Sequence, residues 1–367
     1  MSFLLIFIAI VLFYLGVNAW LFHALLQSVS GWPPLAKWGV GIVYWLLVFA
    51  FFLMQALRDK DLPPTLAHLF YWVSTGWMAF FLYLALSYAI ASLLRLAGLH
   101  LPHAFACCVG LTLLLLAYGY VRFDHPATRR VTVELSRHPS VDSLRVVAIS
   151  DVHLGYGITR RRLRTYVDKI NAERPDLILI AGDLIDMSTV PLHRERMQEE
   201  LRRLKAPMGI YMVPGNHEYI SGIRKSMDFI AQTPITLLRD TVVVLPGGIQ
   251  LIGRDDRSNP RRKTIDQLMA SVDKDAPTIL IDHQPANETL SQLQAVRVDF
   301  GFFGHTHHGQ LWPLSWLTDA IYTQSHGYRT YGDTHVYVSS GLGLWGPPFR
   351  IGTEGEIGVM VFMHARP

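Results

Sequence analysis

Four long apolar runs near the N-terminus constrain the fold of this 367-residue chain more than any other feature. They cover residues 2–24, 36–57, 67–94 and 103–121. A helix needs about 20 apolar residues to cross the hydrocarbon core of a bilayer, and each run is long enough. Trp and Tyr recur near the ends of the runs, as residues at a membrane surface do. Helix-stopping stretches rich in Gly and Pro separate the runs. We therefore predict four transmembrane helices rather than the buried helices of a soluble protein.

Charged residues divide the chain. The first 121 residues hold few of them: Lys37, Arg58, Asp59, Lys60, Asp61 and Arg95. Most of the other ionised side chains follow residue 121. We predict a transmembrane region at 1–121, a linker leading into the soluble domain at 122–143, and the soluble domain at 144–367. The first run has no basic segment before it, so we expect a retained anchor rather than a cleaved signal peptide.

Lys and Arg are unevenly distributed between the two sides of the predicted membrane region. Four spans place both termini on one side, which carries Arg58, Lys60, Arg122, Arg129 and Arg130; the opposite loops hold Lys37 and Arg95. This bias favours a multi-pass protein of the cell (inner) membrane with a cytoplasmic C-terminal domain. The net charge of +4 is compatible with an anionic membrane surface. We expect membrane lipids and no nucleic acid as partners, and we leave the oligomeric state open.

Beyond residue 143 the sequence alternates between short β-branched runs and charged stretches with helical patterns. The predicted buried strands are 144–150, 176–181, 209–214, 242–246, 250–253, 278–281, 298–303 and 336–340. Helices are predicted at 159–173 and at about 190–204, between consecutive strands. This order indicates an α/β domain with an at least partly parallel sheet.

Polar side chains follow five of these strands. The five blocks are Asp151-Val152-His153, Gly182-Asp183-Leu184-Ile185-Asp186, Gly215-Asn216-His217-Glu218, Asp282-His283 and Gly304-His305-Thr306-His307. A single Asp or Asn after a strand is most often a turn or a helix cap. Five blocks in series are not explained by capping. In open α/β sheets the carboxyl ends of the strands border the binding crevice, so we expect these groups to converge there.

The residue types indicate a metal site. Imidazole, carboxylate and amide ligands without thiolate suit Mn, Fe or Zn, and we favour Mn or Zn. The blocks supply more ligands than one ion needs, so we expect two divalent ions bridged by a carboxylate. Such a pair lowers the pKa of a bridging water and holds both the attacking and the departing oxygen of an in-line displacement. This is the chemistry of phosphoester hydrolysis.

The series D-x-H, G-D-x-x-D, G-N-H-E, H, G-H-x-H resembles the calcineurin-like metallophosphoesterase family over about residues 144–365. The resemblance implies a four-layer α/β/β/α sandwich, here preceded by the four-helix transmembrane region. It implies that Asp151, His153 and His307 bind the first metal, that Asn216, His283 and His305 bind the second, and that Asp183 bridges them. His217 would be a histidine outside the metal shell that neutralises or protonates the leaving oxygen, and Asp186 would orient His217.

Other stretches, such as "DVHLGYGITRRRL" and "GHTHHGQLWP", resemble the bacterial membrane-associated phosphodiesterases of this family. That branch usually has Gly where His308 stands, and we expect His308 to lie outside the metal shell. Two features stay open. The Arg160–Arg164 cluster could grip anionic headgroups or the substrate phosphate, or could form a solvated helix face. The apolar loop at 343–352 could rest on the bilayer or receive an acyl chain, or could pack as an ordinary loop.

Taken together, these patterns predict a membrane-anchored phosphoesterase with two metals. It would hydrolyse a phosphodiester or pyrophosphate bond, by attack of a metal-bridged hydroxide, on a lipid-linked or membrane-proximal substrate. Within the family, enzymes that cleave the pyrophosphate of UDP-diacylglucosamine share this motif order; a glycerophospholipid or an isoprenoid phosphate fits equally well. The alternatives are a tethered phosphatase or cyclic-nucleotide phosphodiesterase with a soluble substrate, and a non-catalytic metal-binding sensor or scaffold. A transporter is disfavoured because the spans carry no buried charge.

Overall fold

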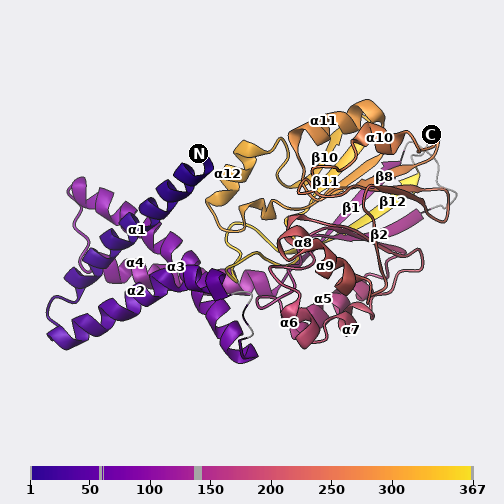
Figure 1. Ribbon diagram of the computed structural model, residues 1–367. Coiled ribbons are helices and arrows are strands. Elements are labelled where there is room, and N and C mark those ends of the chain that lie inside the picture. Colours follow the sequence, from indigo (N-terminus) through magenta and orange to yellow (C-terminus); the bar gives the residue numbers. More distant parts are fainter. Residues whose placement is uncertain (1, 58–59, 61, 136–142, 365–367) are drawn as a thin grey trace. The chain divides into compact units, whose positions relative to one another are not determined.

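The computed structural model describes residues 2–57, 60, 62–135 and 143–364 (Figure 1). The chain forms two compact units. One is Met1–Val121 together with Gly346–Phe349, and the other is Arg122–Trp345 together with Arg350–Pro367. Arg58, which contributes to the predicted topology, lies outside the described residues.

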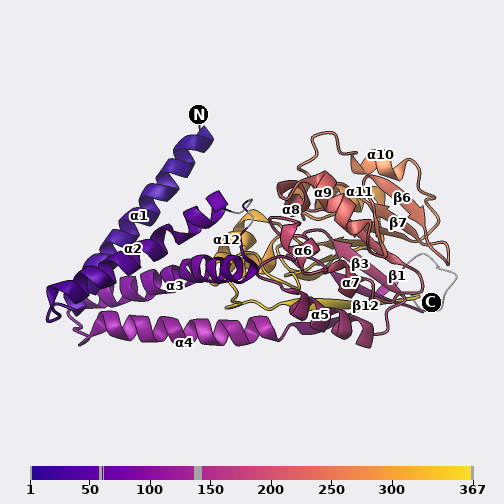
Figure 2. The same cartoon turned by 60° about the horizontal axis from the view of Figure 1, so that its bottom comes forward.

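Four long helices make up most of the first unit, which confirms the predicted four-helix region. They are α1 (Ser2–Ser28), α2 (Pro34–Leu57), α3 (Pro64–Leu96) and α4 (Ala104–Asp124). Each is long and apolar enough to cross a membrane. Helices α2 and α3 begin at prolines, which suit the first turn because its N–H groups have no partner within the helix. Figure 2 shows α3 and α4 side by side, and their Tyr88 and Phe105 rings lie 5.4 Å apart.

Polar side chains inside this unit are paired with one another. The Tyr14 hydroxyl donates a hydrogen bond to the Val48 carbonyl (2.9 Å) and accepts one from the Trp77 indole N–H (3.1 Å). The Tyr44 hydroxyl donates to the Asn18 carbonyl (2.9 Å). Among the described residues of the four helices no Asp, Glu, Lys or Arg side chain is buried. These features match the environment of a bilayer, where polar groups find partners only within the protein.

Two six-stranded sheets form the centre of the second unit. The first contains, in spatial order, β1 (Ala127–Leu135), β12 (Glu356–His364), β2 (Ser143–Ile149), β3 (Leu177–Ala181), β4 (Ile210–Val213) and β5 (Ile235–Leu237). The second contains β10 (Gly327–Tyr331), β11 (Thr334–Val338), β9 (Phe300–Phe303), β8 (Thr278–Ile281), β7 (Gln250–Gly253) and β6 (Thr241–Val244). Strands β2 to β5 run parallel, as do β7, β8, β9 and β11. Parallel strands bring their carboxyl ends to one edge of each sheet.

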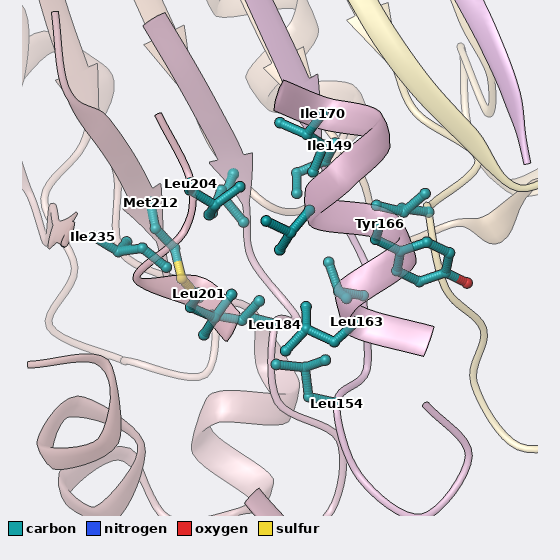
Figure 3. Close-up of a cluster of buried hydrophobic side chains, with 14 of the residues drawn as sticks. Ile149, Leu154, Leu163, Tyr166, Ile170, Leu184, Leu201, Leu204, Met212 and Ile235 are labelled. Atoms are coloured by element: carbon teal, nitrogen blue, oxygen red, sulfur yellow. The ribbon is translucent and has the colours of Figure 1, made fainter. Parts of the chain in front are cut away.

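Helices cover the outer faces of both sheets. Side chains of α5 (Arg160–Ala172) and α7 (Gln198–Leu201) pack on the first sheet, among them Leu163, Ile170 and Leu201 in Figure 3. Helices α10 (Ile265–Met269) and α11 (Asn287–Val296) pack on the second sheet. A separate cluster fills the space between the sheets, where the rings of Phe300 and Phe362 lie 5.0 Å apart. This arrangement confirms the predicted four-layer α/β/β/α sandwich.

All eight predicted strands are present, but the structure adds β1, β5, β10 and β12. Strand β1 lies within 122–143, which we expected to be a linker, and residues 136–142 of that stretch lie outside the described residues. The helix expected at about 190–204 is two short helices, α6 (Val190–Arg194) and α7. Between them Arg196 has a φ of 55°, a left-handed conformation that a continuous helix does not contain. The shorter helices α8 (Asn216–Ile220) and α9 (Ile223–Ile230) follow β4.

Arg160, Arg162 and Arg164 of the Arg160–Arg164 cluster form ion pairs within the second unit. The buried Glu200 carboxylate accepts hydrogen bonds from Arg160 (2.9 Å), Arg164 (2.8 Å) and Arg203 (2.8 Å). Arg162 pairs with Asp124 (2.8 Å). The structure thus favours an internal role for these arginines over a free grip on anionic headgroups. The bonds from Arg164, Arg203 and Arg160 lower the pKa of Glu200 to about 2, although burial opposes this shift.

We predict that Glu200→Gln lowers the melting temperature of the protein by several degrees at pH 7. Because the folded-state pKa of Glu200 is depressed, the ion pairs stabilise the fold fully above the unfolded-state value of about 4.5. This stabilisation is lost as the pH falls toward 2. Thermal unfolding between pH 7 and pH 3 should therefore show a shrinking difference between variant and wild type. Glu199→Gln, at a more exposed partner of Arg160, is the control and should have a smaller effect. A difference that does not change with pH would contradict this account.

Candidate metal centre

The predicted site residues come together at the carboxyl ends of five strands. Asp151 and His153 follow β2, Asp183 and Asp186 follow β3, Asn216 and His217 follow β4, His283 follows β8, and His305 and His307 follow β9. The His305 backbone N–H donates to both carboxylate oxygens of Asp151 (3.0 Å each). This contact joins a loop of the first sheet to a loop of the second. The site therefore lies where the edges of the two sheets meet.

Five of these residues have left-handed backbones. The φ angles are 53° at Asp151, 51° at His153, 51° at Asp183, 73° at His305 and 49° at His307. Such conformations cost non-glycine residues on the order of 1–3 kcal/mol each and cluster at functional sites. The sharp bends turn each side chain away from its strand and toward the other loops. The clustering of strain is independent support for a functional site.

Glycines allow the loops to approach one another closely. A Cβ atom on Gly215 would lie 2.1 Å from Asp183 Oδ1, and one on Gly304 would lie 2.4 Å from Asp151 Oδ2. Any other residue at these two positions would displace a carboxylate of the site. The glycines in the G-N-H-E and G-H-x-H blocks are therefore required by packing.

One group of candidate ligands consists of Asp151, His153 and His307. Their ligand atoms all lie within 4.8 Å of one another, and all three side chains are buried. The Nε2 atoms of His153 and His307 are 3.0 Å apart, and His307 Nε2 is 3.6 Å from Asp151 Oδ1. Burial and the nearby His153 and Arg350 charges lower the pKa of His307 well below its usual value, which keeps the ring neutral as a metal ligand must be.

The second group consists of Asp183, His283 and His305, with Asn216 beside them. Asn216 Oδ1 lies 3.0 Å from His283 Nε2 and 3.0 Å from His305 Nδ1. Asp183 Oδ2 lies 3.2 Å from His283 Nε2. Burial lowers the pKa of His305 to about 4, and the His283 charge acts in the same direction. The structure brings together all four residues for which the sequence predicts roles around a second ion.

The Asp183 carboxylate lies between the two groups. Its Oδ1 accepts the backbone N–H of His217 (2.9 Å). Its Oδ2 lies 3.2 Å from His283 Nε2 and 3.7 Å from His153 Nε2. Because one oxygen is held by the backbone, the other has a fixed direction toward both sets of imidazoles. This is the position that a bridging ligand requires.

The candidate ligands cannot satisfy one another by hydrogen bonding, but divalent cations would satisfy their lone pairs. The facing Nε2 atoms of His153 and His307 can share at most one proton, and the ring nitrogens of His283 and His305 face each other at 3.2 Å. His153 Nδ1 and Asp186 Oδ1 are buried without a hydrogen-bond partner. Several nitrogen and oxygen lone pairs thus converge on shared points, which is the arrangement of a metal shell. The residues could hold two divalent metal ions.

Asp186, His217 and His153 form a third grouping whose ligand atoms also lie within 4.8 Å of one another. Asp186 Oδ1 is 3.4 Å from His153 Nδ1 and 3.3 Å from His217 Nδ1. His153 therefore turns its Nε2 toward Asp151 and His307 and its Nδ1 toward Asp186. A carboxylate behind a ligating histidine commonly accepts its second ring N–H and orients it. This geometry favours Asp186 as a support for both histidines rather than as a ligand.

His217 lies beside the first group, with its ring 4.5 Å from that of His153. Burial alone would lower the pKa of His217, but the adjacent Asp186 carboxylate (3.3 Å) and the charge of Asp183 outweigh it and raise the pKa to about 9. A protonated imidazole is the form that can give a proton to a leaving oxygen. The Trp345 ring lies 6.5 Å from His217, on the loop before Gly346.

Comparisons with known proteins agree with this geometry. Residues 144–309 match the family model described as calcineurin-like phosphoesterase. An uncharacterized metallophosphoesterase of Helicobacter pylori strain J99 is 33% identical over 258 residues, covering 68% of this chain and 68% of its own. The chain belongs to the calcineurin-like metallophosphoesterase family. By its family it is a metal-dependent phosphoric ester hydrolase.

Two further proteins resemble parts of the chain. A cattle protein named transmembrane protein with metallophosphoesterase domain is 30% identical over 297 residues, covering 76% of this chain and 66% of its own. Together with the four apolar helices, this relative indicates a membrane protein. Among solved structures, a 5'-nucleotidase precursor of Thermus thermophilus matches with a TM-score of 0.36 and 17% identity over 60% of this chain. The chain spans only 55% of that longer protein.

Glu218 supports the candidate ligands. No role was predicted for this residue from the sequence. Its buried carboxylate accepts the backbone N–H groups of Asp183 (3.0 Å), Ile185 (2.9 Å) and Gly215 (2.7 Å). Glu218 thus ties the loop after β3 to the loop after β4 and holds Asp183 in place. Burial and the Asp183 charge raise its pKa to about 7. Its place as the last letter of G-N-H-E was the signal that could have identified it.

Arg350 is the second residue that sequence reasoning missed. It is fully buried, and its guanidinium donates to the carbonyls of His307 (3.1 Å), Gly341 (3.2 Å) and Gly343 (2.6 Å). Burial lowers the pKa of Arg350 to about 10, although Asp151 opposes the shift. Arg350 therefore fixes the backbone of His307 from behind. No pattern in the sequence connects positions 307 and 350.

His308 points away from both groups of candidate ligands. Its ring stacks on His326, with centroids 4.7 Å apart and planes at 13°. His308 Nε2 lies 3.7 Å from Asp319 Oδ1. These contacts place His308 beside the metal centre rather than in it.

We predict that His307→Ala lowers the metal content of the purified protein and that His308→Ala leaves it unchanged. The two substitutions remove the same side chain at adjacent positions, so each controls for the other. Metal bound per chain can be measured by inductively coupled plasma mass spectrometry after dialysis. Equal losses in the two variants would show that this division of the histidines is wrong.

We predict that Arg350→Met lowers both the melting temperature and the metal affinity. The substitution removes a donor from three buried carbonyl groups. The His307 and Gly341 carbonyls keep the backbone N–H groups of Gln310 and Glu356, whereas the Gly343 carbonyl keeps no other donor among the described residues, which costs about 1–3 kcal/mol. Arg224→Met, at an exposed position of α9, is the control and should melt close to wild type. Thermal unfolding with and without added Mn²⁺ measures both quantities. An Arg350→Met protein with wild-type stability would contradict the proposed support of His307.

Proposed function

We propose that this chain is a membrane-anchored hydrolase that cleaves a phosphodiester or pyrophosphate bond of a lipid-linked or membrane-proximal substrate. Residues 1–121 would form the anchor and residues 144–367 the catalytic domain. One observation carries the proposal: two groups of nitrogen and oxygen ligands both reach the Asp183 carboxylate, one through His153 and the other through His283. Mn²⁺ or Zn²⁺ suits this set of ligands.

Each residue has a defined task in this proposal. Asp151, His153 and His307 would hold one ion, Asn216, His283 and His305 would hold the other, and Asp183 would contribute to both sites. When bound, two divalent ions would supply an activated water and would neutralise charge on the phosphoryl group. His217 holds a proton on its ring and gives it to the leaving oxygen, while Asp186 keeps His217 and His153 in orientation.

The proposed class of substrate rests on the helices that share the chain with this site. An enzyme tethered by four spans meets lipids at a high local concentration, because its substrate diffuses in the same bilayer. A nucleotide-sugar lipid, a glycerophospholipid and an isoprenoid phosphate all present a phosphodiester or pyrophosphate at the membrane surface. We propose that the substrate belongs to this group.

We also propose that the protein is a multi-pass protein of the inner membrane with its catalytic domain in the cytoplasm. In this topology Lys60, Arg122, Arg129 and Arg130 would lie on the side of the termini, and Lys37, near the start of α2, and Arg95, near the end of α3, would lie on the opposite side. Lys and Arg are enriched in cytoplasmic loops. Accessibility labelling of single cysteines placed in these loops would test the orientation.

The catalytic part of the proposal predicts that His217→Ala reduces turnover about 100-fold or more, the usual contribution of a positioned general acid. Asp183→Asn should reduce turnover at least as much, because the bridge between the ions is lost. The His308→Ala protein should keep wild-type turnover and is the matched control. The assay uses the detergent-purified full chain with Mn²⁺ and a generic aryl phosphodiester. If all three variants match wild type, the chain is not a hydrolase with this site.

The substrate part is tested with a panel of three substrate classes: lipid phosphodiesters and pyrophosphates in vesicles, cyclic nucleotides, and phosphopeptides. We expect turnover of the lipids to exceed that of the other two classes. Turnover confined to cyclic nucleotides or phosphopeptides would reject the lipid substrate and leave a tethered soluble-substrate enzyme.

A further inference from the structure

Large apolar side chains gather on the exposed side of α12 (Leu314–Ile321) and the residues before it. The members of this set, called the α12 face below, are Trp312, Leu314, Trp316, Leu317 and Ile321. Trp316 is 66% exposed and Leu317 is 58% exposed. Single exposed apolar residues are ordinary in soluble proteins, but a contiguous set marks an interaction surface. The Trp312 and Trp316 rings contact each other edge to face at 5.2 Å, so the residues before α12 and its first turn share one apolar surface.

The polarity of α12 is reversed relative to a helix that covers a soluble core. Its buried residue is Ser315, while its large apolar residues face outward. Asp319 is the one exposed charge among its eight residues. An ordinary surface helix carries its apolar stripe on the inner side. The α12 face is therefore built for an apolar environment outside the domain.

The α12 face is connected to the metal centre by short, tightly packed segments. Gly309, two residues after His307, has a φ of 72°, and a Cβ there would lie 2.3 Å from the Ser315 nitrogen. The Trp312 N–H donates to the Ile351 carbonyl (2.7 Å). The Gln310 amide pairs with both the N–H and the carbonyl of Trp345 (3.1 and 3.0 Å), whose ring lies beside His217. The position of α12 therefore fixes the distance of the metal centre from whatever α12 contacts.

Arginine side chains border the end of α12. The exposed Arg329 donates to the carbonyl of Thr323, two residues beyond the helix (3.0 Å). Arg257 lies near Tyr322 and is half-exposed, 4.0 Å from Glu288. Helices that lie in the surface layer of an anionic bilayer commonly combine Trp and Leu on the apolar side with Arg beside them. The same chain also carries four helices that are long and apolar enough to cross a bilayer.

We infer that the α12 face inserts into the headgroup layer of an anionic lipid bilayer and holds the metal centre at the level of lipid phosphates. This inference rests on the proposed function, because it explains how a phosphodiester or pyrophosphate of a membrane lipid reaches the site without leaving the bilayer. Trp316 and Leu317 enter the apolar boundary, and Arg329 and Arg257 contact the lipid phosphates. The substrate is then a lipid whose scissile phosphate lies in the headgroup region.

Fluorescence quenching by lipids tests the insertion directly. The full chain, with Cys107→Ser and Cys108→Ser, receives a single cysteine by Leu317→Cys, is labelled with bimane and is reconstituted in vesicles containing phosphatidylglycerol. Lys225→Cys, at an exposed position of α9, is the control. We expect lipids with a doxyl group near the top of the acyl chain to quench the Leu317→Cys label at least about twofold, because interfacial helices reach about 5–10 Å into this boundary. The Lys225→Cys label should not be quenched.

A Leu317→Cys label that is not quenched by doxyl lipids overturns the inference, whether the label is exposed to water or shielded by another protein surface. The two cases differ in the emission maximum of bimane, which shifts to the blue in an apolar site. A blue-shifted label without lipid quenching would show that a second copy of the chain or another protein covers the α12 face.

A pair of activity measurements separates this inference from the proposed function. The double variant Trp316→Glu, Leu317→Glu should hydrolyse a soluble aryl phosphodiester at the wild-type rate. Its turnover of a phosphodiester lipid in vesicles should fall about tenfold, because glutamates do not enter an anionic surface. Equal losses on both substrates would indicate a distorted site and overturn the inference. A wild-type protein inactive on both substrates would reject the proposed function, and the quenching experiment would still decide the contact with the bilayer.

Discussion

The Asp183 carboxylate is the contact on which the rest of the site depends. One of its oxygens accepts the His217 N–H, and the other lies between the imidazoles of His153 and His283. The Asp183 N–H is held by the buried carboxylate of Glu218. A charge in a buried position needs partners on every side, and two cations with their histidines would provide them. The loops around Asp183 are shaped to make this arrangement possible.

The fold creates this arrangement by joining the edges of two sheets. Residues after β2, β3 and β4 come from one sheet, and residues after β8 and β9 come from the other. Left-handed backbones at five of them aim the side chains inward, and this strain must be held by the surrounding structure. Glu218 holds the loops of the first sheet, and Arg350 holds the backbone of His307. The same loops continue into α12, so a domain that binds a membrane through α12 would present its metal centre to the headgroups.

Sequence patterns predicted the features that are determined by residues close together in the chain. Apolar runs predicted the four helices and eight strands, and the blocks at strand ends predicted which side chains converge. Strand β1 was missed although Val131, Val133 and Leu135 alternate with polar residues, because this alternation is short and follows two arginines in a stretch expected to be a linker; its pairing with β12 defines it. Arg350 and the α12 face were missed for a related reason: the first acts through residues 43 positions away, and the second is recognised only by what it leaves exposed.

A crystal structure of the full chain grown with Mn²⁺, with anomalous diffraction data, tests the central claim most directly. The account predicts two anomalous peaks about 3.5–4 Å apart, one on each side of Asp183. The first peak should contact Asp151, His153 and His307, and the second should contact Asn216, His283 and His305. A single peak, or a peak held by Asp186 and His217 instead of Asp151 and His307, would contradict it.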